Sequence, residues 1–214
     1  MVNWHDIDTV LLDMDGTLLY LHYDNYFWLS YLPQRYAEIH KTSLAAAKKV
    51  LEYHAQTTKG TLDWYCLDYW SAALNLDIVP LKKEVEYKVQ ERPHTKNFLD
   101  FLAANDKTVA LVTNAHPQTL ALKLSLTSIG DQLDHIISSH QFRQPKESQQ
   151  FWRRLHKYLN FDPQRTLFID DTVQILRAAE TFGIKHIMAI HQPDSQIQRQ
   201  LKDIPALHHF DEIM

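Results

Sequence analysis

Acidic residues in this chain stand at the ends of short apolar runs, together with a threonine, an asparagine and a lysine. The residues concerned are Asp13, Asp15, Thr113, Asn114, Lys146, Asp170 and Asp171. Carboxylates that crowd together cannot all stay ionised unless a cation neutralises them. A divalent ion with oxygen ligands, Mg²⁺ by preference, would do this and keep positions free for a phosphate. Because the lysine and the threonine would bind phosphate oxygens, the set predicts phosphoryl-transfer chemistry, which depends on positioning and charge stabilisation.

Five apolar runs of strand length would have to carry these residues to one place. The predicted strands are residues 9–13, 109–113, 135–138, 166–170 and 186–190. Their apolar residues are uninterrupted rather than alternating, which is typical of strands buried on both faces of a parallel sheet. Predicted helices separate the later four strands, at residues 117–127, 145–159 and 172–182. This alternation predicts an α/β fold with a doubly wound, parallel, five-stranded sheet.

In such a fold, ligands bind beyond the carboxyl ends of the strands, at a point where the strand order reverses. The predicted strand ends carry Asp13 and Asp15, then Thr113 and Asn114, then Asp170 and Asp171, while Lys146 opens the helix after the third strand. Any one of these acids could simply cap a helix or end a strand. Their occurrence at several strand ends favours one shared site.

The segment between the first two strands breaks the alternation. It contains helix-like stretches at residues 25–39, 43–54, 62–73 and 81–90, and no convincing strand. A segment of this length is too long for an ordinary strand-to-helix connection, so we predict a small helical domain inserted into the core. The predicted boundaries are 1–19 and 92–214 for the core and 20–91 for the insertion. Its aromatic residues, dense between Trp64 and Trp70, are expected to form mainly a small core, with a minority facing a cleft.

Composition excludes several classes of protein. The four glycines form neither a dinucleotide-binding loop nor a P-loop. The net charge of −4 offers no broad basic face for nucleic acid or an anionic membrane. One cysteine, Cys66, excludes an internal disulfide, and neither a signal peptide nor an 18-residue apolar run is present. We therefore expect a cytoplasmic protein with a small-molecule partner; no pattern indicates an oligomeric state.

The ordered motifs resemble those of haloacid dehalogenase superfamily phosphatases. The resemblance rests on Asp13-Met14-Asp15-Gly16-Thr17, Thr113, Lys146 and Asp170-Asp171, and the insertion is similar to that superfamily's helical type 1 cap. Further stretches resemble the GMP/IMP nucleotidase branch: residues 8–19, 24–28, 64–70, 113–117 and 145–147. The last resemblance implies a purine nucleoside 5′-monophosphate as the substrate.

The resemblance also implies a role for each residue. Asp13 would attack phosphorus and form an aspartyl-phosphate, and Asp15 would protonate the leaving oxygen and then activate water. Thr113, Lys146 and the Asn114 backbone N–H would bind the phosphate, helped by amides of the turn at Met14–Gly16. Mg²⁺ would be held by the carboxylates of Asp13 and Asp170 and the main-chain carbonyl of Asp15. Asp171 would not bind the metal directly: it would either lie behind the metal ligands or contact the metal through a water molecule.

Other interpretations remain open at this point. The same residues would serve a phosphatase of a sugar phosphate or phosphoglycolate, a phosphomutase, or a protein that only binds its ligand. Dehalogenase chemistry is disfavoured because Asp15 is present and displacing halide requires no proton donor. A receiver domain is disfavoured because its acidic pair follows the first strand, whereas here the pair comes last. His116 and Arg92 are candidates for contacting the substrate, whereas Cys66 is expected to serve packing.

Overall fold

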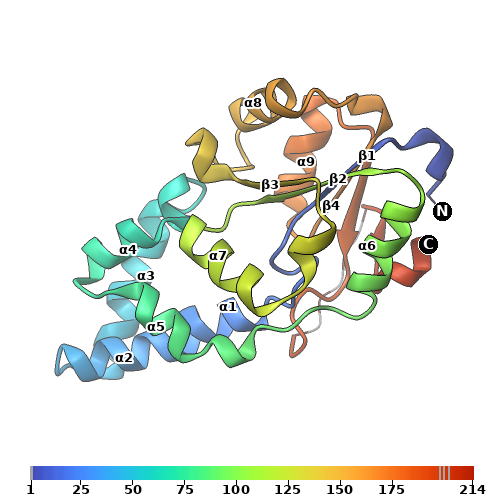
Figure 1. Cartoon of the computed structure of the whole chain (residues 1–214). Helices are drawn as coiled ribbons and strands as arrows, with labels where there is room; N and C mark the ends of the chain where they lie inside the picture. The colour runs from blue at the N-terminus through green and yellow to red at the C-terminus, as the bar shows by residue number, and fades with distance from the viewer. Residues whose placement is uncertain (1, 198, 200, 202) are drawn as a thin grey trace.

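Six parallel strands form one sheet in the order β3-β2-β1-β4-β5-β6 (Figure 1). This computed structural model describes residues 2–197, 199, 201 and 203–214. The strands are β1 (Thr9–Leu12), β2 (Thr108–Thr113), β3 (His135–Ser138), β4 (Thr166–Asp170), β5 (His186–Ile190) and β6 (Ala206–Leu207). β1 and β4 are buried along their whole length, as their uninterrupted apolar residues predict. The predicted doubly wound parallel α/β fold is therefore confirmed.

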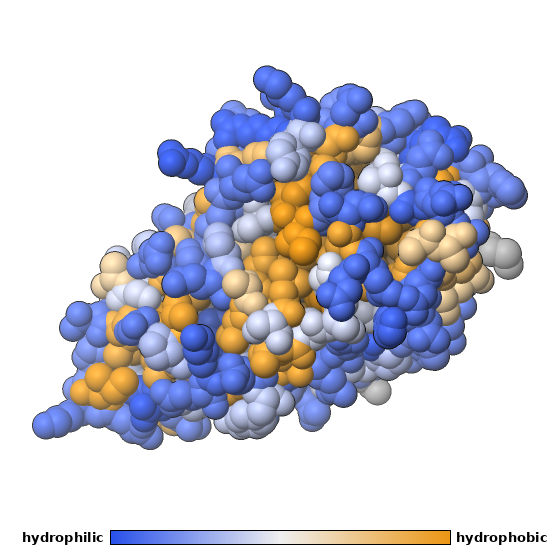
Figure 2. Space-filling model, viewed as in Figure 1, coloured by the Kyte–Doolittle hydropathy of each residue, from blue (hydrophilic) through white to orange (hydrophobic). Residues whose placement is uncertain are grey.

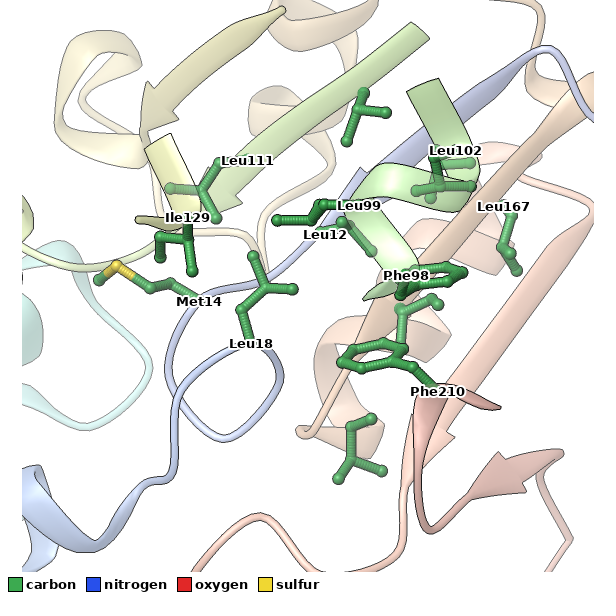
Figure 3. Close-up of a cluster of buried hydrophobic side chains, with 14 of the residues drawn as sticks. Leu12, Met14, Leu18, Phe98, Leu99, Leu102, Leu111, Ile129, Leu167 and Phe210 are labelled. Carbon is green, nitrogen blue, oxygen red and sulfur yellow. The ribbon is translucent and has the colours of Figure 1, made fainter. Parts of the chain in front are cut away.

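Helices cover both faces of the sheet. They are α6 (Thr95–Ala104), α7 (Pro117–Leu126), α8 (Gln149–Leu159) and α9 (Val173–Phe182). Successive residues of a strand point to opposite faces, so Leu12 packs with Phe98 of α6 on one side (Figure 3). Leu11 packs with Trp152 of α8 and Leu176 of α9 on the other side. The sheet thus lies between two apolar layers, and only its edges and strand ends are left for chemistry.

The core differs from the sequence prediction at three places: two elements that were not predicted and one helix that begins later than predicted. The sheet has a sixth strand, β6, whose two residues pair with Ala189 and Ile190 of β5 and are too few to form a recognisable apolar run. Helix α6 was not predicted, although its buried Phe98 and Leu102 have helical spacing. Helix α8 begins at Gln149, after the N-cap Ser148 and not at residue 145, because the Ser148 side chain accepts the Gln150 N–H.

The segment between β1 and β2 is helical, as predicted. Its helices are α1 (His22–Tyr26), α2 (Leu32–Ile39), α3 (Leu44–Thr58), α4 (Leu67–Leu74) and α5 (Ile78–Glu84), which lie together beyond one end of the core in Figure 1. They share a hydrophobic cluster of their own that includes Phe27, Trp70 and Ile78. The chain enters and leaves this segment side by side, since Tyr20 N–H donates to Gln90 O. The boundaries at residues 20 and 91 stay a prediction, which this pairing supports.

The helices inside this segment differ in extent from the prediction. Helix α3 continues to Thr58, four residues beyond the predicted end at residue 54, whereas the other stretches are interrupted. The stretch at residues 25–39 is divided by a wider helical turn at Phe27–Tyr31. The stretch at residues 62–73 is divided at Cys66, whose backbone is extended between a 3₁₀ turn (Leu62–Tyr65) and α4. The stretch at residues 81–90 is α5 followed by a 3₁₀ turn at Glu86–Lys88. Cys66 is therefore presented by a bend and not by a helix face.

The visible face of the molecule is largely hydrophilic, with hydrophobic side chains gathered in a band over its middle, where α7 and β3 lie (Figure 2). β3 is an edge strand of the sheet, and its first two residues, His135 and Ile136, are exposed. Among the described residues, no helix is both long enough and apolar enough to cross a membrane.

Candidate active site

The carboxyl ends of β1, β2 and β4 lie side by side because β1 is the middle strand of the three. The register aligns Leu12 of β1 with Leu111 of β2 and with Ile169 of β4. Asp13 and Asp170 follow directly, so both reach the same edge of the sheet. The strand ends that the sequence singled out are thus brought together.

Lys146 is the buried cation at this edge, with 1% of its surface exposed. Its Nζ donates to Asp13 Oδ1 at 2.5 Å, to Asp170 Oδ2 at 2.8 Å and to the Val112 carbonyl at 2.9 Å. Three acceptors match the three donors of an ammonium group. Burial alone would lower the pKa of Lys146, but the two carboxylates outweigh it and raise that pKa. Lys146 therefore stays charged and neutralises part of the negative charge around Asp13.

Asp13, Asp170 and Asp171 form a compact acidic cluster, in which one oxygen of each lies within 4.8 Å of the others. Burial is the main cause that raises the pKa of Asp13 to about 7, of Asp170 to about 6 and of Asp171 to about 7. Neighbouring carboxylates add to this effect, and Lys146 opposes it. Three crowded carboxylates with one lysine leave excess negative charge, which a hard cation with oxygen ligands relieves. The donor set therefore fits Mg²⁺.

Asn114 holds Lys146 in place through its side chain. Asn114 Oδ1 accepts the Lys146 N–H at 2.9 Å, and Asn114 Nδ2 donates to Glu147 Oε2 at 3.1 Å. Glu147 in turn accepts the hydroxyl of Tyr65, from the helical segment, at 2.7 Å. The neighbouring Thr113 is buried, and its Oγ1 accepts the Ala115 N–H at 3.0 Å. Because a hydroxyl that accepts still has its own proton to donate, Thr113 can bind a further oxygen.

The turn after Asp13 depends on Gly16, whose φ of +88° favours glycine. A Cβ built there would lie 2.7 Å from Asp171 Cγ and 2.9 Å from Pro193 Cβ. The Gly16 N–H donates to Leu19 O at 2.7 Å. Of the turn amides predicted to bind phosphate, this one is therefore already engaged within the protein.

The carboxylate of Asp15 is not part of the acidic cluster, although its charge helps to raise the pKa of Asp13. It accepts from Lys123 of α7, which also donates to Asp24 Oδ2 at 2.5 Å. Lys82 of α5 donates to the other oxygen of Asp24 at 3.0 Å. Burial opposes the ionisation of Asp24, but Lys123 and Lys82 outweigh it and lower the pKa of Asp24 to about 2. These four residues form an alternating chain of charges, called the Asp15–Lys82 chain below.

Sequence reasoning did not identify Lys82 or Lys123. One signal was available for Lys123: it is spaced four residues after Thr119 and three after Leu120, on the buried face of α7. A lysine on a buried helix face requires a carboxylate partner. The sequence pattern does not say which carboxylate that partner is.

A cavity of about 690 Å³ joins the acidic cluster to the helical segment. At one end it is lined by all the residues that the sequence singled out, namely Asp13, Asp15, Thr113, Asn114, Lys146, Asp170 and Asp171. At the other end it is lined largely by apolar and aromatic side chains, including Leu51, Ala55, Trp28, Trp64 and Trp70. The cavity is therefore polar and charged at one end and largely apolar at the other, where Lys48 and Glu52 are the charged side chains of the lining.

The two further candidates, His116 and Arg92, lie in different places. His116 lines the cavity, and its Nε2 is 3.6 Å from Asp68 Oδ2. Arg92 is buried and its guanidinium donates to the carbonyl oxygens of Gln192 and His208. Arg92 is not among the residues that line the cavity. It instead ties the C-terminal part of the chain to the core, so the prediction that it could contact a substrate finds no support.

Comparison with known proteins gives close relatives over the whole chain. The GMP/IMP nucleotidases YrfG of Escherichia coli (strain K12) and of Shigella flexneri are each 40% identical to it over 214 residues. The match covers 100% of this chain and 96% of each relative. Identity at this level over full length places this chain and its relatives in one family.

Solved structures share the fold at lower identity. A HAD phosphatase from Thermococcus onnurineus superimposes with a TM-score of 0.80 at 20% identity, covering 97% of this chain and 96% of that one. An L-2-haloacid dehalogenase from Xanthobacter autotrophicus superimposes with a TM-score of 0.61 at 16% identity, covering 89% of this chain and 80% of that one. Residues 7–183 match the family model of the haloacid dehalogenase-like hydrolases. The chain belongs to this family of hydrolases.

Proposed function

We propose that this protein is a Mg²⁺-dependent phosphomonoesterase that forms an aspartyl-phosphate and hydrolyses the purine nucleoside 5′-monophosphates GMP and IMP. The observation that carries the proposal is the buried pair of Asp13 and Lys146 at the charged end of a cavity of about 690 Å³. The 40% identity to nucleotidases of that specificity supports the choice of substrate.

Asp13 is the proposed nucleophile. A carboxylate oxygen of Asp13 bonds to phosphorus as the bond from phosphorus to the ribose 5′ oxygen breaks. Lys146 supports this step because its charge favours the ionised form of Asp13. Asp15 donates a proton to the leaving 5′ oxygen and then removes one from the water that attacks the aspartyl-phosphate. That second attack releases inorganic phosphate and restores the Asp13 carboxylate.

Three groups are proposed to hold the phosphate during both steps. They are the Thr113 hydroxyl, the Asn114 backbone N–H and the Lys146 ammonium, which together offer hydrogen bonds and positive charge to the non-bridging oxygens. Thr113 and Asn114 follow one strand end and would keep their positions when a phosphate binds. Lys146 would give up one of its three hydrogen bonds, to Asp13, Asp170 or the Val112 carbonyl, in order to reach a phosphate oxygen.

Mg²⁺ is proposed to bind the carboxylates of Asp13 and Asp170 and the main-chain carbonyl of Asp15. Asp171 either contacts it through water or orients its ligands. The ion would neutralise charge on the phosphate and on the acidic cluster.

The apolar end of the cavity is proposed to hold the purine. Aromatic rings such as those of Trp28, Trp64 and Trp70 stack on planar bases, and stacking does not by itself distinguish one purine from another. The helical segment that carries these rings would close over the bound nucleotide and exclude bulk water, which strengthens the electrostatic interactions at the phosphate.

The test is phosphate release in Mg²⁺ from IMP, GMP, AMP, a sugar phosphate and phosphoglycolate. We expect the highest kcat/KM for IMP and GMP, and no turnover in the Asp13→Asn variant, because its amide is not a nucleophile. If the sugar phosphate or phosphoglycolate is preferred, the protein is still a phosphatase, but the proposal that nucleotides are its substrates is wrong. Transfer of phosphate to a second substrate molecule would indicate a phosphomutase, and no release from any ester would reject the phosphatase.

A further inference from the structure

A second cluster of metal-ligand side chains lies beside the cavity, apart from the acidic one. Cys66, His116 and His140 each offer one ligand atom, and these three atoms all lie within 4.8 Å of one another. Cys66 is in the bend before α4, His116 precedes α7, and His140 is in the 3₁₀ turn Ser139–Phe142 after β3. The cluster therefore joins the helical segment to the loops that follow two neighbouring strands.

The two imidazoles are brought together by the sheet itself. β2 and β3 are paired with Thr113 opposite Ser138, so the loops after both strands leave the same edge. Ser138 Oγ also donates to the Ala115 carbonyl at 2.7 Å, which fixes one loop against the other. The rings of His116 and His140 meet nearly at right angles, with centroids 5.0 Å apart.

This spacing suits a tetrahedral metal. With zinc–nitrogen bonds of about 2.0–2.1 Å, two imidazoles on one zinc have ring centroids about 5 Å apart, and ligand atoms about 3.3–3.6 Å apart. The nitrogens and the sulfur, which lie within 4.8 Å of one another, would thus need to approach by up to about 1.5 Å. Asp68 Oδ2 lies 3.6 Å from His116 Nε2 on an exposed side chain. It is outside the group of three mutually close ligand atoms, so it would have to move toward Cys66 and His140 to become a fourth ligand.

An unsatisfied nitrogen points independently to a ligand. Within the described part of the chain, the buried Nε2 of His140 has no hydrogen-bond partner. His116 Nδ1 accepts the Gln118 N–H only at 3.4 Å, a long contact that would be given up for metal binding at Nε2.

We propose that Cys66, His116 and His140, with Asp68 as the fourth ligand, form a zinc site that ties the helical segment to the core. Thiolate and imidazole ligands select a borderline-soft ion such as Zn²⁺, whereas the all-oxygen acidic cluster suits Mg²⁺. One thiolate and one carboxylate also balance the charge of Zn²⁺. The proposal does not depend on the substrate or reaction proposed above.

The test uses Co²⁺ as a spectroscopic probe, added to the metal-free full-length protein in a large excess of Mg²⁺. Mg²⁺ fills the oxygen site, so that only a site with sulfur and nitrogen ligands is left for Co²⁺. We expect one equivalent to bind, with visible bands of tetrahedral cobalt and a near-ultraviolet band of thiolate-to-cobalt charge transfer. Zn²⁺ should then displace the cobalt and abolish both sets of bands.

Three variants separate this site from the acidic cluster. Cys66→Ser should lose the charge-transfer band. Its affinity for Co²⁺ should fall at least about 100-fold, because removing a ligand costs more than removing a residue that only hydrogen-bonds to a ligand, which lowers affinity roughly 10–100-fold. His140→Gln should weaken binding similarly. Asp170→Asn should keep both bands. Zn²⁺ should also raise the melting temperature of the wild type but not of Cys66→Ser. The two proteins differ only in one side-chain atom, sulfur or oxygen, so the variant is expected to fold normally.

Two results would overturn the proposal. One is the absence of saturable Co²⁺ binding in excess Mg²⁺. The other is Co²⁺ binding with the same spectrum in the wild type and in Cys66→Ser, because the metal would then be held elsewhere.

Discussion

Lys123 donates a hydrogen bond to the carboxylate of Asp15, although 108 residues separate the two in the chain. The contact is one link of the Asp15–Lys82 chain, which runs from the end of β1 through α7 to the helical segment. Lys123 is 1% exposed and Lys82 is 2% exposed. Because buried lysines need partners, this chain fixes where the Asp15 side chain points when no substrate is bound.

Replacing Lys123 with methionine should impair the protonation of the leaving group. Asp15 would lose the partner that positions it, and misplacing a catalytic group by about 1 Å can cost 10²-fold in rate. We expect kcat/KM for a nucleoside monophosphate to fall by about 10–100-fold. The kcat/KM for p-nitrophenyl phosphate, whose leaving group needs no proton, should fall far less, because this ratio does not include the later attack of water on the aspartyl-phosphate. Steady-state kinetics on both esters would measure the difference.

A matched control is Lys96→Met, since Lys96 pairs with Asp100 at 3.2 Å on the surface. It should change neither activity nor stability measurably. The free energy of unfolding of Lys123→Met should also be lower than that of the wild type. Breaking a fully buried ion pair costs roughly 3–5 kcal/mol, and the loss here should be smaller because Asp15 and Asp24 are partly exposed. Equal losses in kcat/KM on both esters in Lys123→Met would indicate a structural role and contradict the assignment.

Replacing Asp15 with asparagine should separate acid–base chemistry from metal binding. An amide cannot exchange the proton, so we expect turnover of nucleoside monophosphates to fall by about 10²–10⁴-fold. Mg²⁺ affinity should change little, because the Asp15 carboxylate is outside the cluster of Asp13, Asp170 and Asp171. Kinetics and calorimetric Mg²⁺ titration of the same preparation test both statements. A large loss of Mg²⁺ affinity would show that the Asp15 side chain is needed for metal binding.

Gly16→Ala should damage the acidic cluster, and Gly60→Ala is its control. Both glycines have positive φ, +88° and +80°, so both alanines carry backbone strain of about 1 kcal/mol. Only at Gly16 would the new Cβ collide with other residues, Asp171 and Pro193, while nothing lies within 4 Å at Gly60. Gly16→Ala should therefore lose more stability, and also Mg²⁺ affinity. Equal melting temperatures and equal Mg²⁺ binding for the two variants would contradict this prediction.

Stabilisation by Mg²⁺ should increase with pH. Burial raises the pKa of Asp13 and Asp171 to about 7, above the 3.8 of a free aspartate, so the folded protein holds these protons more tightly than the unfolded chain. The contribution of these groups to stability is therefore present at acidic pH and is lost as the pH rises through about 7. Mg²⁺ binds the ionised carboxylates, so the melting-temperature shift should be small at pH 5 and large at pH 8.

The measurement is thermal unfolding with and without Mg²⁺ across that range, with Asp170→Asn as the control. The variant lacks one carboxylate of the cluster and should show a reduced shift at pH 8. A wild-type shift that does not depend on pH would exclude the acidic cluster as the Mg²⁺ site.

Trp64→Ala should weaken nucleotide binding selectively. Trp64 lines the apolar end of the cavity and is 37% exposed, so its loss should disturb the fold little. Stacking contributes about 1–3 kcal/mol per base, so KM for GMP and IMP should rise by roughly 5- to 150-fold. KM for a small ester without a base should not change. Tyr87→Ala, at an exposed ring outside the cavity lining, should have no effect on either KM.

Local patterns in the sequence were enough to predict the core of the site. Uninterrupted apolar runs predicted parallel strands, and parallel strands bring their carboxyl ends to one edge whatever the connections between them. Asp13 and Asp170 meet at that edge because the strands that precede them are neighbours. The sixth strand was not predictable in this way, because β6 has two residues and depends on pairing with β5.

The sequence by itself determined which strand ends carry acids and that a long helical segment interrupts the core. Only the tertiary structure decided which partners these side chains have. Lys123 binds the carboxylates of Asp15 and Asp24, and Arg92 donates hydrogen bonds to carbonyl groups in the C-terminal part of the chain. Cys66 lies close to two histidines. The physical reason is that periodicity reports which face of an element is buried. It does not report which distant side chain is buried against it, and burial with a particular partner sets the charge of each group.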